Sequence, residues 1–281
     1  MKIFITGGTG FIGSHLINEL SKFDYDLICL RRQNSDTRIP LKKEPQWINE
    51  DINLDNIEFL RGVDVVINIA AVGVSPQISS WEEMERININ LARNLLLMAI
   101  KSGVKRFIAI GSSFEYGNEA NFWEKIPPYA SLNPVSLYGI SKAASFFLLN
   151  EIAQKSNIEF FYSRVFTAYG KGQFSGNLYP ELEKAALKGE DFILKKPNLI
   201  RDFISIKDVI KHLRIAINRK DINSFKPKIV NIGSGEGLSI YEFASKKWSS
   251  LNATGKLKLI ESKSKNFELP KMVADLKGLN Y

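Results

Sequence analysis

The segment that decides the fold lies near the amino terminus and reads Thr6-Gly7-Gly8-Thr9-Gly10-Phe11-Ile12-Gly13. It follows a short apolar run and precedes an amphipathic segment, so it is predicted to be a turn between a strand and a helix. Small residues let the backbone approach a pyrophosphate closely, and the first N–H groups of the helix face the phosphates. We therefore expect a dinucleotide site that includes Gly7, Gly10, Phe11, Ile12 and Gly13.

Short apolar runs alternate with longer amphipathic segments through the first two-thirds of the chain. The predicted strands are Lys2–Thr6, Asp26–Leu30, Trp47–Asn49, Val63–Ile69, Phe107–Ile110 and Phe160–Arg164. The predicted helices are Gly10–Ser21, Ile57–Leu60, Trp81–Ser102, Ser136–Lys155 and Tyr179–Lys188. Strands and helices that alternate in this way predict an α/β fold with a Rossmann-type, doubly wound parallel sheet.

The character of the sequence changes past Gly170, where Gly, Pro, Lys and Asn become more frequent. The remaining strand signals, Lys228–Ile232 and Lys256–Ile260, are isolated. We therefore expect a dinucleotide-binding domain over residues 1–169 that also receives about 201–232. Residues 170–200 and 233–281 are expected to form a smaller, discontinuous C-terminal lobe that binds substrate.

Composition narrows the possible classes of partner. The 281 residues are 44% apolar and 24% charged, with a formal net charge of +8. The lysines are scattered and form no basic stripe with interleaved aromatic residues, so we expect no nucleic acid partner. One cysteine and two histidines cannot form a His/Cys metal cluster, so we expect no metal. Neither a signal peptide nor a membrane-spanning stretch is evident, and we expect a cytoplasmic protein without membrane contact.

The end of the second predicted strand bears on the choice of cofactor. NAD-binding proteins carry an acidic residue there that accepts hydrogen bonds from the adenosine ribose, whereas this strand ends Leu30-Arg31-Arg32-Gln33. Guanidinium groups suit a 2′-phosphate, so Arg31 and Arg32 favour NADP(H), with NAD(H) still possible. The alternative is that both arginines are solvated loop residues. Further on, Asp51-Ile52 follows the third strand, where the acid could reach the adenine amino group.

A tyrosine and a lysine lie four residues apart in Tyr138-Gly139-Ile140-Ser141-Lys142, at the start of a predicted helix. They share one helix face, where the lysine is expected to lower the pKa of the tyrosine. Tyr138 could then exchange the proton that accompanies hydride transfer at a carbinol carbon, and Lys142 could hold the nicotinamide ribose. The preceding strand ends in Ser112-Ser113, whose hydroxyls are expected in the ligand crevice, although either serine could instead cap its own turn.

Taken in chain order, the glycine turn, the serine strand end and Tyr-x-x-x-Lys resemble the extended short-chain dehydrogenase/reductase family, in its nucleotide-sugar epimerase/dehydratase branch. The resemblance continues through Asn68-Ile69-Ala70-Ala71, Arg164-Val165-Phe166-Thr167-Ala168-Tyr169-Gly170 and Arg201-Asp202-Phe203. It implies that Ser112, Tyr138 and Lys142 are catalytic and that Ala70 and Ala71 lie against the cofactor. It also implies a nucleotide-sugar substrate and a homodimer through residues 81–102 and 136–155. The substrate contacts that it implies are Ser113, Phe114, Thr167 and Arg201.

The reaction that the resemblance implies depends on the residues after Ser112. Nucleotide-sugar 4,6-dehydratases carry Asp-Glu there, and this chain has Ser113-Phe114, so dehydration is not expected. We expect NADPH-dependent reduction of a 4-keto nucleotide-linked (deoxy)sugar for surface-polysaccharide sugar biosynthesis, because it needs a single proton donor and agrees with Arg31 and Arg32. An NAD-dependent nucleotide-sugar 4-epimerase is the first alternative. A non-catalytic dinucleotide-binding scaffold on the same fold is the second.

Overall fold

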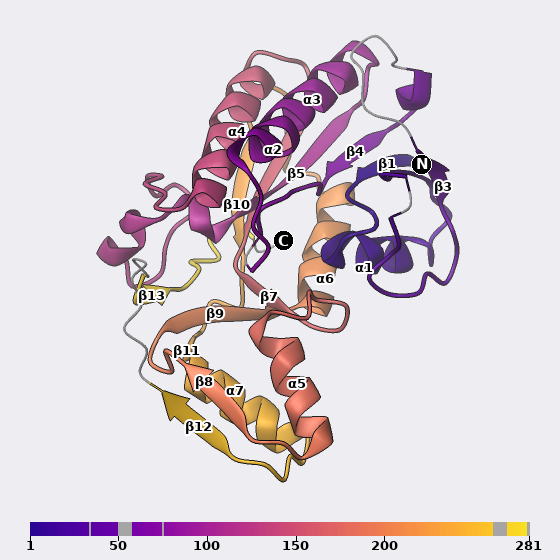
Figure 1. Ribbon diagram of the computed structural model, residues 1–281. Helices are drawn as coiled ribbons and strands as arrows, with labels where there is room; N and C mark the ends of the chain where they lie inside the picture. Colours follow the sequence, from indigo (N-terminus) through magenta and orange to yellow (C-terminus); the bar gives the residue numbers. More distant parts are fainter. Residues whose placement is uncertain (34, 50–57, 75, 261–268, 280–281) are drawn as a thin grey trace.

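A computed structural model describes residues 1–33, 35–49, 58–74, 76–260 and 269–279. Its main feature is a seven-stranded parallel sheet in the order β3-β2-β1-β4-β5-β6-β10 (Figure 1). The strands are β1 (Lys2–Thr6), β2 (Asp26–Leu30), β3 (Gln46–Ile48), β4 (Val65–Asn68), β5 (Arg106–Ser112), β6 (Glu159–Val165) and β10 (Lys228–Ile232). The chain runs outward from β1 in one direction and from β4 in the other, which confirms the doubly wound α/β fold.

Helices cover both faces of this sheet. On one face α1 (Phe11–Leu20) and α6 (Ile206–Asn218) pack against alternate strand residues such as Ile3 and Ile5. On the other face α3 (Ala92–Lys101) and α4 (Leu137–Gln154) pack around Phe4 and its neighbours. Because both faces are buried, the central strands read as continuous apolar runs, as their sequence predicts.

The segment predicted as one helix over Trp81–Ser102 is three pieces in the structure. A wide π-helical turn, η2 (Glu85–Leu91), joins the short helix α2 (Trp81–Met84) to α3. Within this turn the buried Asn88 accepts a hydrogen bond from the backbone N–H of Val72 at 2.9 Å and donates to Ser141 Oγ at 2.9 Å. The wide turn thereby ties the loop after β4 to α4. In the described residues the 3-10 helices are η1 (Glu58–Leu60), η3 (Ser113–Glu115) and η4 (Asn118–Phe122).

The remaining elements lie below the main sheet in the view of Figure 1. Four short strands, β7 (Thr167–Tyr169), β9 (Ile200–Ser205), β11 (Gly237–Ser239) and β13 (Lys271–Met272), form a second sheet around β9. A parallel pair, β8 (Phe192–Lys195) and β12 (Leu257–Ile260), packs with α5 (Leu178–Lys188) and α7 (Ile240–Ser250) around a separate apolar cluster. In the part of the chain that the structure describes, no helix is long and apolar enough to cross a membrane.

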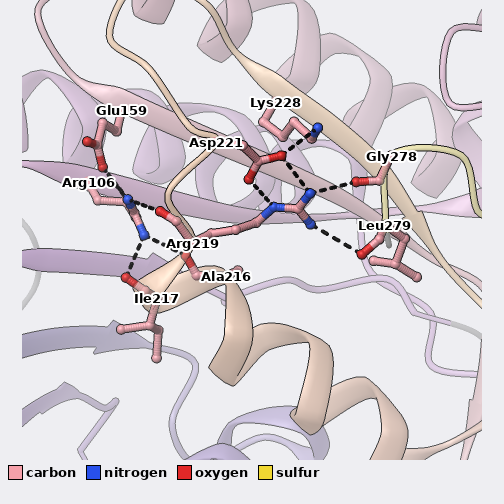
Figure 2. Close-up of polar contacts among 9 residues, drawn as sticks. All are labelled: Arg106, Glu159, Ala216, Ile217, Arg219, Asp221, Lys228, Gly278 and Leu279. Carbon is pink, nitrogen blue, oxygen red and sulfur yellow. Dashed lines mark hydrogen bonds and ion pairs between the residues drawn. The ribbon is translucent and has the colours of Figure 1, made fainter. Parts of the chain in front are cut away.

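Two arginines make polar contacts at the end of the sheet where β5 and β6 begin (Figure 2). Arg106, the first residue of β5, pairs with Glu159 and donates to the carbonyls of Ala216 and Arg219 at 2.8 and 2.7 Å. These carbonyls lie at the end of α6, where the last residues of a helix leave backbone acceptors unpaired. The guanidinium of Arg106 therefore caps α6.

The second arginine holds the carboxyl-terminal segment. Arg219 pairs with Asp221 and donates to the carbonyls of Gly278 and Leu279 at 2.9 and 3.3 Å (Figure 2). Leu279 is buried in the same apolar cluster as α1 and α6, so the segment closes the main core. Asp221 also pairs with Lys228 of β10 at 2.9 Å.

Candidate active site

The glycine turn lies at the carboxyl end of β1, where the sheet reverses its order. Gly7 has a φ of +73°, and a Cβ there would lie 2.7 Å from the backbone nitrogen of Ala70. A Cβ at Gly13 would lie 2.1 Å from the carbonyl oxygen of Gly7. Neither position therefore has space for a side chain, and the turn brings α1 close to both β1 and the Ala70-Ala71 loop.

The start of α1 has the properties of an anion site. Its N-cap, Gly10, provides no side-chain hydrogen bond, and the first helical turn, which includes Phe11 and Ile12, carries no acidic residue. Backbone N–H groups at such a terminus, together with the helix dipole, favour negative charge. The cradle formed by Gly7, Gly10 and Gly13 consequently fits the pyrophosphate of a dinucleotide.

The two arginines expected from the sequence directly follow β2, which pairs with β1 so that Leu30 lies opposite Thr6. The guanidinium of Arg31 lies over the Trp47 ring, 4.8 Å from its centroid, and Nε donates to Asn49 Oδ1 at 2.8 Å. Arg32 is exposed next to it. Asp51 and Ile52, the other residues expected near the adenine, lie outside the described residues.

Three predicted catalytic residues come together at the carboxyl end of β5. Ser112 ends that strand, and Tyr138 and Lys142 occupy the first two turns of α4. The Ser112 side chain lies close enough to Tyr138 to influence its pKa, and the ammonium of the buried Lys142 donates to the Ile110 carbonyl at 2.6 Å. The helix can approach this closely because a Cβ at Gly139 would lie 2.6 Å from the carbonyl oxygen of Phe114.

The electrostatics of the site differ from the expectation in one respect. Burial, followed by the negative charge of Glu115, raises the pKa of Tyr138, while the hydrogen bond with Ser112 opposes this rise. Burial lowers the pKa of Lys142, and the charge of Glu115 opposes the fall. The expected lowering of the tyrosine pKa by the lysine is therefore wrong for this structure: desolvation of the phenol dominates, and the opposing effect comes from Ser112 and not from Lys142.

Glu115 is the residue of this site that sequence reasoning missed. A dehydratase of the family would carry its acid one residue earlier, and the sequence therefore does not predict Glu115 as a site residue. Its side chain is fully buried and pairs with the equally buried Arg164 at 2.6 Å. The signal that could have revealed the pair is the presence of opposite charges at the ends of two apolar strands expected to be neighbours, since buried charges are paired.

The residues predicted to bind substrate occupy different environments. Phe114 is 44% exposed, and its ring meets that of Tyr138 edge-on with 6.2 Å between centroids, whereas Ser113 is buried beside it. Thr167 is half-buried on β7. Arg201 is half-buried on β9, where its guanidinium donates to the carbonyls of Ile200 and Leu269 at 2.8 and 2.9 Å. The structure thus brings Phe114 to the group of Ser112, Tyr138 and Lys142, while these bonds of Arg201 go to the protein backbone.

A dinucleotide cradle at the switch point of a doubly wound sheet, with serine, tyrosine and lysine at the next strand end, defines an extended short-chain dehydrogenase/reductase. Among the described residues, no group of three His, Cys, Asp or Glu side chains could hold a metal ion. The chain belongs to the NAD dependent epimerase/dehydratase family, whose model matches residues 3–233. It is accordingly an enzyme of the nucleotide-sugar epimerase/dehydratase group, whose members use NAD.

Individual relatives agree with this assignment. A putative UDP-glucose 4-epimerase of Methanocaldococcus jannaschii is 28% identical over 248 residues, which cover 85% of this chain and 79% of the relative. A UDP-glucuronic acid 4-epimerase from Bacillus cereus, solved with UDP-glucuronic acid and NAD, is 25% identical with a TM-score of 0.84, covering 99% of this chain and 91% of that one. A UDP-N-acetylglucosamine 4-epimerase from Methanobrevibacter ruminantium, solved with UDP-N-acetylmuramic acid, shares the fold at 23% identity and a TM-score of 0.86, over 99% and 90% of the two chains.

Proposed function

We propose that this chain is an NAD-dependent 4-epimerase of a UDP-linked sugar. The observation that carries the proposal is the group of Ser112, Tyr138 and Lys142 beside Phe114, an apolar ring where dehydratases of the family carry an acid. A 4-epimerase needs one side chain that removes and returns a proton at a single oxygen, without a second acid to expel water. The UDP-sugar epimerases among the relatives support the same choice. The proposal therefore prefers epimerisation to the reduction expected from the sequence.

In this reaction the protein moves one proton and orients one oxygen. The phenol oxygen of Tyr138 removes the proton of the sugar 4-hydroxyl and later returns it. The hydroxyl of Ser112, at the end of β5 beside Tyr138, donates to the same sugar oxygen and fixes its position. The ammonium of Lys142 stabilises the ionised phenol, whose resting form is protonated because burial raises its pKa.

The cofactor is proposed to lie along the edge formed by the turn and the loop after β4. Gly7, Gly10 and Gly13 hold its pyrophosphate, and Ala70 and Ala71 border it. Lys142 holds the nicotinamide ribose. When bound, NAD⁺ supplies a hydride acceptor for the sugar C4 and a positive charge beside the phenol.

The second lobe is proposed to bind the nucleotide sugar. In this proposal residues 170–200 and 233–281 form the lobe, and residues 1–169 with about 201–232 form the dinucleotide-binding domain. Thr167 and Arg201 lie on β7 and β9, which connect the two parts, so they are proposed as substrate contacts.

The identity of the retained dinucleotide tests this function. We would denature freshly purified protein and identify any released dinucleotide by mass spectrometry, and then incubate intact protein with UDP-glucose and look for UDP-galactose. Bound NAD⁺ and interconversion without added reductant are expected. NADP(H), or conversion that consumes added NADPH, would contradict epimerisation.

A second candidate, NADPH-dependent reduction of a 4-keto nucleotide sugar, is favoured by Arg31 and Arg32. In the segment 30–33 that ends β2, the structure describes no acidic residue for the ribose of NAD. Replacement Arg31→Asp distinguishes the two candidates. Under reduction it should reverse the preference between NADPH and NADH, whereas an epimerase that retains NAD⁺ should keep its cofactor.

We also propose a homodimer through α3 and α4. The outer faces of these helices carry exposed apolar side chains, including Leu97 and Phe147, which are 39% and 58% exposed. Light scattering should give twice the chain mass for the wild type and a single chain mass for Phe147→Glu. A wild-type monomer would contradict the proposal.

A further inference from the structure

Glu115 lies directly behind the catalytic serine, at the end of η3, and is completely buried. Its Oε1 accepts hydrogen bonds from the backbone N–H of Ser112 at 2.7 Å and from the hydroxyl of Tyr162 at 2.8 Å. Its Oε2 accepts from Arg164 Nε at 2.6 Å. A Cβ at Gly111 would lie 2.3 Å from Oε1, so the carboxylate fills the space available to it. The position of this negative charge is therefore fixed from two strands.

Stability alone does not account for this pair. Taking two charges out of water costs as much as their attraction returns, so apolar side chains of similar volume could fill the same space without loss of stability. The surroundings of Glu115 indicate another role, because titratable groups face it from three elements. These neighbours are Tyr116 after η3, Tyr162 and Arg164 on β6, and Tyr138 and Lys142 on α4.

We propose that Glu115 is a positioning residue for the acid–base chemistry, a role that rests on the function proposed above for Tyr138. Its bond to the backbone of Ser112 holds the serine against Tyr138. Its charge, kept in place by Arg164, lies behind Tyr138 and Lys142 and holds the protons on both groups in the resting protein.

The titration directions agree with this geometry. The charge of Glu115 raises the pKa of Tyr138 and raises that of Lys142 against the larger, lowering effect of burial. Arg164 in turn holds the carboxylate in place through an ion pair at 2.6 Å. Neutralising Glu115 should consequently let Tyr138 lose its proton at a lower pH.

The test measures the ionisation of Tyr138 directly by tyrosinate absorbance. Wild type and Glu115→Gln are each compared with the same protein carrying Tyr138→Phe, so that the difference isolates this one phenol. At a fixed alkaline pH below the midpoint, each unit by which the pKa falls raises the ionised fraction about tenfold. We expect a several-fold larger fraction in Glu115→Gln. An equal fraction in the two proteins would overturn the proposal.

Two further variants keep the result interpretable. Tyr162→Phe removes a hydrogen bond from the same carboxylate without changing its charge, so it should leave the ionised fraction of Tyr138 unaltered. A change as large as that of Glu115→Gln would mean that packing, not charge, acts on the phenol. If Glu115→Gln alone does not fold, Glu115→Gln with Arg164→Met removes both charges, and the same increase is expected there.

The pH dependence of turnover gives a second readout. With UDP-glucose as substrate, the acidic limb of the rate profile of Glu115→Gln should move to lower pH. Absence of turnover in every variant would contradict the proposed reaction, but the absorbance result would still decide the effect of Glu115 on Tyr138.

Discussion

Two ion pairs link β6 to β5 or to the turn after it, one at each end of the strands, and their surroundings differ. At the amino ends Arg106 of β5 pairs with Glu159 of β6, and the arginine donates to the last carbonyls of α6 (Figure 2). Near the carboxyl ends Glu115, in η3 directly after β5, pairs with Arg164 of β6, and both are fully buried behind Ser112, Tyr138 and Lys142. Pairs of the same residue types thus hold a helix in one place and face titrating groups in the other. The groups around an ion pair therefore determine whether its loss would change the stability of the protein or the chemistry of the site.

The largest effect is expected from the chemistry at the carboxyl end. Tyr138→Phe should reduce turnover by about 10²–10⁴-fold, because the proton then has no acceptor. Steady-state rates with UDP-glucose measure the loss, and Tyr241→Phe, on the exposed side of α7, is the matched control and should keep full activity. Turnover that survives Tyr138→Phe would mean that Tyr138 does not transfer the proton. The ion pair of Glu115 and Arg164 would then lie beside no catalytic group, and the two pairs would no longer differ in this respect.

At the amino end the expected effect is on stability. Arg106→Met leaves Glu159 and the last carbonyls of α6 without this donor, and should lower the free energy of unfolding by about 3–5 kcal/mol. Lys105 also faces Glu159, at 4.0 Å, but its side chain is 75% exposed, so Lys105→Met should cost less than about 1 kcal/mol. Urea unfolding compares the two variants. Equal losses of unfolding free energy in the two variants would show that the burial of Arg106 does not make its pair with Glu159 stronger than that of Lys105.

A third variant displaces the buried carboxylate of Glu115 without altering its charge, and so tests whether its position matters to Ser112. Gly111→Ala places a methyl group against Glu115 Oε1 and the Tyr162 ring. Overpacking of this kind should cost about 1–3 kcal/mol in unfolding free energy. Turnover should fall as well, because Ser112 is bonded to the displaced group. A stable variant with normal turnover would mean that the position of Glu115 does not matter to the serine.

The smallest effect is expected at Asp221, whose side chain is 50% exposed. Its hydrogen bond with Arg219, ahead of other causes, lowers the pKa of this carboxyl below its usual 3.8. A lowered pKa means that the stabilisation is present above pH 3.8 and is lost as the pH falls toward the folded-state pKa. Asp221→Asn should therefore be less stable than wild type at neutral pH, by no more than about 1 kcal/mol for so exposed a group.

Urea unfolding at neutral and at acidic pH measures this difference. The gap between Asp221→Asn and wild type should narrow once the wild-type carboxyl is protonated. A gap of the same size at both values would assign the loss to geometry and not to charge.

The sequence predicted the parts of the fold that depend on local patterns. The glycine turn and the apolar runs of the central strands specify the parallel sheet, since each pattern reports directly on backbone conformation or on burial. Helix α6 was nevertheless missed, although Ser205 caps its start and apolar residues recur at helical spacing through Ile206, Val209 and Leu213. This helical pattern lies in the region past Gly170, where the change in composition obscures it.

Other features could not be predicted, because they depend on contacts between distant segments. The bond of Arg31 to Asn49 and its stacking on Trp47 join two strands, so the strand end alone did not reveal them. The rise in the pKa of Tyr138 depends on how deeply α4 packs against η3, which the spacing of tyrosine and lysine does not encode. That Ser112, Tyr138 and Lys142 lie together was predictable, and their electrostatic environment was not.

The wide turn η2 has a consequence for how this sequence can change over evolutionary time. A π-helical turn holds one residue more than an α-helical turn, in the manner of an insertion accommodated inside a helix. Deleting one residue from Glu85–Leu91 would let the turn close to regular α-helical geometry, because it removes the residue that the wide turn accommodates. The placement of Asn88 would then change, and its hydrogen bonds join the loop after β4 to α4. Such a deletion should therefore preserve the helix but weaken this link.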